Sequence, residues 1–221
     1  MPERTRIRRL PQRAAYDRAT IDSILDEALV CHLGIVWDDA PLVVPTLQAR
    51  VGDDLYVHGS AASRTLRALA GGIEICLTVT LVDGLVLARS AFHHSVNYRS
   101  AMLFGRAELL EAAEEKRRAL EAFTEKLVPG RWPEVRPPSP KELKATAVLR
   151  LPIGEASAKV RSGPPLDDEE DYERDVWAGV IPLGVRRLWP EPDAELKSGV
   201  ELPAYLRLDR HFEHTDSQST G

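Results

Sequence analysis

Short apolar runs separated by tight turns constrain the fold of this chain most strongly. Cys31–Trp37, Leu42–Val51 and Leu55–His58 are rich in aliphatic and β-branched residues, as is typical of strands. Asp38-Asp39 and Gly52–Asp54 separate these runs, and such residues favour reversal of the chain. Since strands joined by two- or three-residue turns pair antiparallel, the sequence predicts a β-meander here.

The pattern continues through the rest of the chain. Asp83-Gly84 predicts a hairpin between strands at 73–81 and 85–90, because Asp-Gly is a strong signal for a two-residue turn. Pro45 lies inside a predicted strand and removes a backbone donor, so it marks a sheet edge or a bulge. Further strands are expected at 98–110, 145–151, 155–161 and 176–183.

Three helices interrupt these strands. Asp17 caps a predicted helix that runs to about Leu29, Ser63–Ala70 forms a short helix, and Ala112–Val128 is the longest. The Pro-rich stretch 129–140 reads as a loop. Eight or nine short strands with inserted helices indicate a mainly β fold, an antiparallel barrel or sandwich, rather than alternating βαβ units.

Length and composition exclude several classes of protein. A chain of 221 residues with 43% hydrophobic residues forms one packed domain, which we place at 16–185, between an Arg-rich arm (1–15) and an extended tail (186–221). A net charge of −5 disfavours a nucleic-acid partner. No apolar run approaches the ~18–20 residues that span a bilayer. Two isolated cysteines, Cys31 and Cys76, make neither a disulfide framework nor a zinc cluster, so a cytoplasmic location fits best.

The segment from Tyr56 to Arg67 is the strongest candidate for a binding site. A strand ends at His58, Gly59 lets the backbone turn, and Ser63 leads into a helix whose free amide groups favour an anion. Arg64 adds a guanidinium suited to a phosphate. The alternative interpretation is that Ser63 is a simple helix cap and Arg64 a surface charge.

A second polar segment runs from Ser90 to Ser100. Its hydroxyl, imidazole, amide and guanidinium groups precede a strand and would fall at one rim of a barrel. Adjacent His93 and His94 point to opposite sides of an extended backbone, so no zinc site is expected. The alternative is a polar loop whose side chains satisfy backbone groups. Lys159 and Arg161 alternate along one strand face, which faces either a cleft or solvent.

These segments together resemble the flavin-nucleotide-binding relatives of pyridoxamine 5'-phosphate oxidase, and among them the branch of the nitroimidazole-resistance proteins. The resemblance covers about residues 16–183. The positions that carry it are Thr46, Tyr56–Ser60, Ser63-Arg64, Asp83-Gly84 and Asn97–Ser100.

The resemblance implies an FMN-binding split β-barrel that forms a homodimer and holds FMN between its subunits. It places Pro45 and Thr46 along the flavin ring and His58, Gly59, Ser63 and Arg64 beside the ribityl chain and phosphate. Tyr98, Arg99 and Ser100 would come from another strand that lines the cofactor, and Lys159 is a further contact. His58 is the candidate reactive or proton-supplying residue, since a near-neutral pKa suits proton transfer.

The expected function is that of an FMN-dependent oxidoreductase that links NAD(P)H to a small electrophilic acceptor, in the manner of a nitroreductase. Trp177–Leu183 replaces the arginine-rich final strand of the true pyridoxamine phosphate oxidases, so oxidation of vitamin B6 is not expected. The alternatives are a flavin-binding protein without turnover, such as a sensor, and the same barrel with a deazaflavin or haem.

Overall fold

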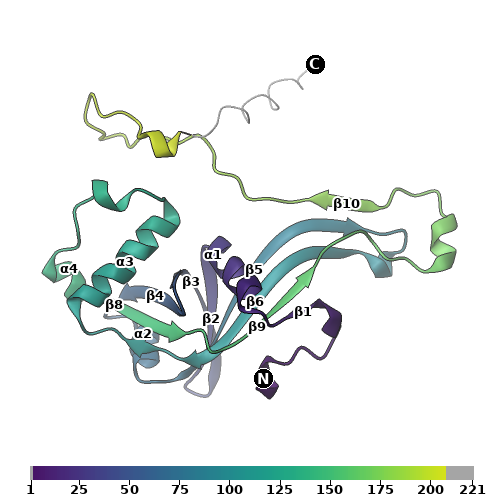
Figure 1. Cartoon of the computed structure of the whole chain (residues 1–221), viewed down its shortest axis with the longest axis horizontal. Coiled ribbons are helices and arrows are strands. Elements are labelled where there is room, and N and C mark those ends of the chain that lie inside the picture. The colour runs from purple at the N-terminus through teal and green to yellow at the C-terminus, as the bar shows by residue number, and fades with distance from the viewer. Residues whose placement is uncertain (1, 208–221) are drawn as a thin grey trace. The chain divides into compact units, whose positions relative to one another are not determined.

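The computed structural model describes residues 2–207. The chain divides into two compact units between Gly184 and Val185 (Figure 1). The first unit holds all the strands and α-helices of the described residues, and the second holds one short 3-10 turn, Ala204–Leu206. The first unit contains both the arm and nearly all of the β-domain that the sequence analysis places at 16–185.

The first unit is built on an antiparallel sheet with the strand order β1-β9-β6-β5-β2-β3-β4-β8-β7, and β10 pairs with the outer half of β5. The sheet curls (Figure 1) around the larger of two buried apolar clusters. The strands are β1 (Ala14–Ala15), β2 (Val30–Trp37), β3 (Ala40–Val51), β4 (Asp54–Ser60), β5 (Glu74–Leu87), β6 (Ser95–Arg106), β7 (Glu108–Leu109), β8 (Thr146–Pro152), β9 (Glu155–Arg161) and β10 (Gly179–Pro182).

Helix α1 (Arg18–Glu27) fills the core on the inner side of this sheet. Ile24 and Leu25 are completely buried, and the helix packs against strands β3, β5, β6 and β9. Asp17 begins the helix as predicted, because its Oδ1 accepts a hydrogen bond from the backbone N–H of Thr20 at 2.9 Å. An N-cap of this kind is typically worth about 1 kcal/mol.

Three more α-helices lie between the strands: α2 (Arg64–Ala70), α3 (Ala113–Leu127) and α4 (Pro140–Ala145). Helices α2 and α3 confirm their predictions to within a residue or two. Helix α4 was not predicted: it begins at Pro140, the last residue of the predicted loop, and fills the interval before the predicted strand at 145–151. Its Ser139 and Glu142 form a reciprocal capping box and Pro140 occupies the first turn, so this proline starts a helix.

The predicted hairpin at Asp83-Gly84 is wrong. Strand β5 continues through these residues with a bulge between Val82 and Gly84, and it pairs with β6 on both sides of the bulge. A Cβ at Gly84 would lie only 3.0 Å from Cγ1 of Val180 and 3.1 Å from the carbonyl oxygen of Ile181. The glycine therefore allows β10 to approach β5 closely, and it does not form the turn that the sequence predicts.

The predicted turns near the N-terminus are present. Asp38 and Asp39 have φ angles of 51° and 59°, and Gly52 has 59°, so the chain reverses through left-handed backbone there. Pro45 is confirmed at an edge position. It pairs with His32 of β2, whereas β4 pairs with β3 only from Gln48 onward, so the missing N–H of Pro45 costs no ladder bond.

Candidate functional site

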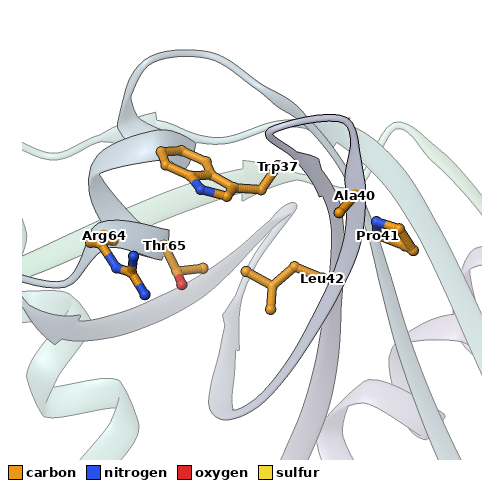
Figure 2. Close-up of a pocket in the computed structure, with 6 residues that line it drawn as sticks. All are labelled: Trp37, Ala40, Pro41, Leu42, Arg64 and Thr65. Atoms are coloured by element: carbon orange, nitrogen blue, oxygen red, sulfur yellow. The ribbon is translucent and has the colours of Figure 1, made fainter.

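A pocket opens between the tip of the β2–β3 hairpin and the first turn of α2 (Figure 2). Its volume is about 230 Å³. Most of its lining atoms are apolar, and its charged member is Arg64. The lining residues are Trp37, Ala40, Pro41, Leu42, Arg64 and Thr65.

The hairpin sequence explains why the indole reaches this position. Trp37 pairs with Ala40 across the two-residue Asp38-Asp39 turn, so both side chains lie on the same face of the hairpin. Ala40 is too small to fill the space opposite the indole. Leu42 follows on the same face, and its pairing partner Ile35 is buried in the core. Trp37 thus extends the core-facing row past the end of the barrel, where it remains 38% exposed.

Arg64 enters the pocket from the first turn of α2. Within residues 2–207 its guanidinium has no hydrogen-bond or ion-pair partner, whereas Arg67 one turn later donates to the carbonyl oxygen of Ala62. Ser63 caps the helix by accepting from the N–H of Leu66, so its hydroxyl is already engaged. Arg64 is therefore a cation beside an apolar pocket without a protein counterion in the described chain.

Gly59 determines how closely α2 approaches strand β4. A Cβ at this position would lie 2.8 Å from Cδ1 of Leu66, a buried residue of α2. Any side chain at residue 59 would displace the helix that carries Arg64 or force Leu66 to another rotamer. Gly59 is a packing requirement of the pocket rather than a flexible turn.

His58 lies on β4, on the side that faces α3. Its ring meets the ring of Phe123 edge-on, with centroids 4.2 Å apart. Its Nδ1 is buried without a hydrogen-bond partner, and burial lowers the pKa of the imidazole below its usual value. Burial therefore favours the neutral imidazole, and no described protein group bonds to its Nδ1.

Arg99 contrasts with Arg64. It donates to both carboxylate oxygens of Asp83 at 2.9 and 2.7 Å, and it forms a second bidentate pair with Glu27 at the end of α1. These hydrogen bonds lower the pKa of both carboxyl groups and raise that of Arg99. Two carboxylates therefore neutralise this guanidinium, whereas Arg64 has no carboxylate partner in the described residues.

Four other predicted residues lie on the outer face of the sheet. Strand register puts Tyr98 opposite Arg161 and Ser100 opposite Lys159, and opposed residues share a face. The Ser100 hydroxyl donates to the carbonyl oxygen of Lys159, and Lys159 Nζ donates to that of Arg9. Pro45 lies on this same outer face. Thr46, its neighbour, pairs with buried Cys31 and faces the other way.

The polar segment at 90–100 forms a short 3-10 turn, Ala91–His93, before β6. Both ring nitrogens of His93 are buried without hydrogen-bond partners, and Asp168 lies 3.6 Å from its Nε2. His94 Nδ1 contacts the carbonyl oxygen of Ser90 at 2.8 Å. Across residues 2–207, no three side chains of the metal-ligating types gather into one site.

Of the predicted site residues, only Arg64 lines the pocket. The prediction missed Trp37, Leu42 and Thr65. The available signal was an aromatic residue directly before the Asp38-Asp39 turn, because a residue in that position projects beyond the end of the strand pair. His58 is close to Arg64 in the sequence, but its side chain faces α3 and not the pocket.

This fold is that of a known protein family. The family model described as pyridoxamine 5'-phosphate oxidase matches residues 17–160, well over half of the chain. The chain belongs to this family. The mainly antiparallel barrel described above is the split barrel of its members, as the sequence resemblance implied.

Two solved structures match nearly the whole chain. The flavocytochrome Anf3 from Azotobacter vinelandii is 47% identical over 93% of this chain and 95% of its own, with a TM-score of 0.88. The FAD and heme binding protein from Mycobacterium smegmatis is 40% identical over 88% and 95%, with a TM-score of 0.85. A 5-nitroimidazole antibiotic resistance protein from Bacteroides thetaiotaomicron is 27% identical over 66% and 86%, with a TM-score of 0.57.

No curated protein matches the chain in sequence. Among the described helices, none combines the length and the apolar character needed to cross a membrane.

Proposed function

We propose that this protein is a redox protein that binds a flavin nucleotide and a haem, with Arg64 at the flavin phosphate and His58 as a haem-iron ligand. The observation that carries the proposal is the pairing of two unused groups: a guanidinium without a counterion and a buried imidazole nitrogen without a partner. The relatives that match most of the chain are named for these two cofactors.

The pocket at Arg64 fits a flavin nucleotide. A flavin phosphate carries more than one negative charge at neutral pH and requires a cation that is not already neutralised. Arg64 meets that requirement and Arg99 does not. When bound, the flavin would supply the electron chemistry, and the chain would contribute binding and orientation.

His58 fits a haem ligand. An imidazole binds iron through a neutral ring nitrogen, and burial beside Phe123 keeps this ring neutral at pH 7. A haem would supply a one-electron redox centre. The role of His58 in this proposal is to bind the iron, which replaces the expected role of proton donor.

The finer expectations from the sequence belong to the same proposal. They name NAD(P)H as the electron donor, a small electrophile as the acceptor and a homodimer with the flavin between subunits. Support for a homodimer comes from apolar side chains exposed on the outer face of the sheet: Val30, Val43, Val82 and Met102. Both FMN and FAD carry a phosphate that Arg64 could bind, so this arginine alone does not distinguish the two flavins.

The test is the visible spectrum of the purified full-length protein, with its own cofactors or after reconstitution with haem and flavin. We expect flavin bands and a Soret band in the wild type. His58→Ala should lose the Soret band and retain the flavin, whereas His94→Ala, which changes an exposed histidine, should retain both.

A His58→Ala protein that binds haem with an unchanged Soret band would refute the ligand assignment. If His58→Ala is poorly folded, His58→Gln provides the same test, because it keeps a polar side chain of similar length without the imidazole. A wild type that takes up neither cofactor would overturn the proposed function.

A further inference from the structure

We propose that the Trp37 pocket is an adenine-binding subsite, so that the bound flavin is the dinucleotide FAD rather than FMN. The inference rests on the proposed function, because it assumes a flavin nucleotide with its phosphate at Arg64. It adds the group that lies beyond the phosphate and the residue that recognises it.

The shape and chemistry of the pocket fit an aromatic base. Its volume of about 230 Å³ exceeds what a single phosphate needs, and its surface is mainly apolar. In Figure 2 the flat indole of Trp37 faces the side chains of Thr65 and Leu42 across the pocket. An exposed tryptophan face is a strong platform for stacking a base.

The position of Arg64 links this pocket to a phosphate. Arg64 and Trp37 line the same pocket, and Arg64 is the charged group among its lining residues. A ligand that satisfies both must carry an aromatic ring system within reach of a phosphate. In this proposal the isoalloxazine lies on the other side of the phosphate, so FMN would leave the indole uncovered, whereas FAD continues through a second phosphate and a ribose to adenine.

The polar content of the pocket indicates how the base is read. Thr65 is the uncharged polar side chain of the lining, so the pocket has little capacity to distinguish base edges by hydrogen bonds. Recognition therefore depends on stacking and on the phosphates. The rigid two-residue turn at Asp38-Asp39 fixes the indole before the ligand binds, which lowers the entropic cost of binding.

The experiment compares FAD, FMN and ADP binding to flavin-free full-length protein by isothermal titration. Trp37→Ala should weaken FAD binding by about 5- to 150-fold, the range for losing one base–aromatic stack, and leave FMN binding within about twofold. Trp37→Phe should retain most of the FAD affinity. ADP should compete with FAD in the wild type and lose this ability in Trp37→Ala.

Trp177→Ala is the matched control, because it removes a more exposed tryptophan that lies outside the pocket and should leave all three affinities unchanged. Equal effects of Trp37→Ala on FAD and FMN, or no effect on either, would overturn the adenine subsite while the proposed function stands. If the wild type binds neither flavin, the proposed function fails as well. Thermal melting checks that each variant is folded.

Discussion

Arg64 and Arg99 are two arginines that the sequence resemblance places at the cofactor and that differ in their structural surroundings. The resemblance puts Arg64 beside the phosphate and Arg99 on another strand that lines the cofactor. Arg99 bridges Glu27 of α1 and Asp83 in the β5 bulge, so it holds the core helix to the sheet. Arg64 has no such partner in the described chain and faces a pocket.

A counterion decides whether an arginine is available to a ligand or stabilises the fold. The partners of Arg99 lie 72 and 16 residues away in sequence. Only folding brings them together, and only the bulge, which replaces the predicted turn, presents the Asp83 carboxylate to Arg99. Residue type and spacing locate both cations but do not assign their roles.

The largest effect is expected at the unpaired arginine. Arg64→Ala should weaken flavin binding by roughly 1.5–3 kcal/mol, because it removes a charge-assisted hydrogen-bond donor to a phosphate. Equilibrium titration of flavin fluorescence measures this loss. Arg67→Ala, one turn along the same helix, is the control and should bind flavin nearly as well as the wild type. An Arg64→Ala protein with unchanged affinity would mean that the phosphate lies elsewhere.

Substitution of the paired arginine, Arg99, should change the stability of the protein and leave its flavin affinity unchanged. Arg99→Ala should lower the free energy of unfolding by about 1 kcal/mol, since it leaves two half-exposed carboxylates without their partner. Urea denaturation measures this change. Flavin affinity should remain at the wild-type level. Loss of flavin binding in a fully folded Arg99→Ala protein would remove the distinction between the two regions.

A smaller effect is expected in the pH dependence of stability. The pKa values of Glu27 and Asp83 are lowered in the folded state, so the unfolded chain binds their protons first as the pH falls. Their contribution is therefore complete at neutral pH. It disappears as the pH drops below their ordinary values, about 4.3 and 3.9, and through the depressed folded values.

Denaturation curves between neutral and acidic pH test this expectation. Arg99→Ala should show a flatter acid dependence than the wild type, because its carboxyl groups have lost their main stabilising partner. Parallel curves for the two proteins would show that the ion pairs contribute nothing measurable. Arg64→Ala should leave the shape of the curve unchanged.

Local chemistry made much of the fold predictable. Alternating strands, left-handed turns at Asp38-Asp39 and Gly52, and the caps at Asp17 and Ser63 act within a few residues, so they can be read from the sequence. The bulge at Gly84 could not be read in this way. Its glycine is required by β10, nearly a hundred residues later in the chain, and the same Asp-Gly pair also specifies a turn.

The candidate site is predictable only where its residues belong to local features of the chain. The sequence points to Arg64 because a strand, a short connection and a helix cap are local features. It does not point to Trp37, because the pocket of Trp37 needs the β2–β3 hairpin and α2 side by side. The resemblance points to His58, but the buried Nδ1 of His58 and its contact with Phe123 depend on where α3 packs.

Titration of FAD into the flavin-free full-length protein, run alongside Arg64→Ala and Arg99→Ala, tests whether Arg64 binds the flavin phosphate while Arg99 stabilises the fold. We predict saturable binding to the wild type, similar binding to Arg99→Ala, and roughly 10- to 150-fold weaker binding to Arg64→Ala. Equal affinity of all three proteins, or no saturable binding of FAD or FMN to the wild type, would contradict the account.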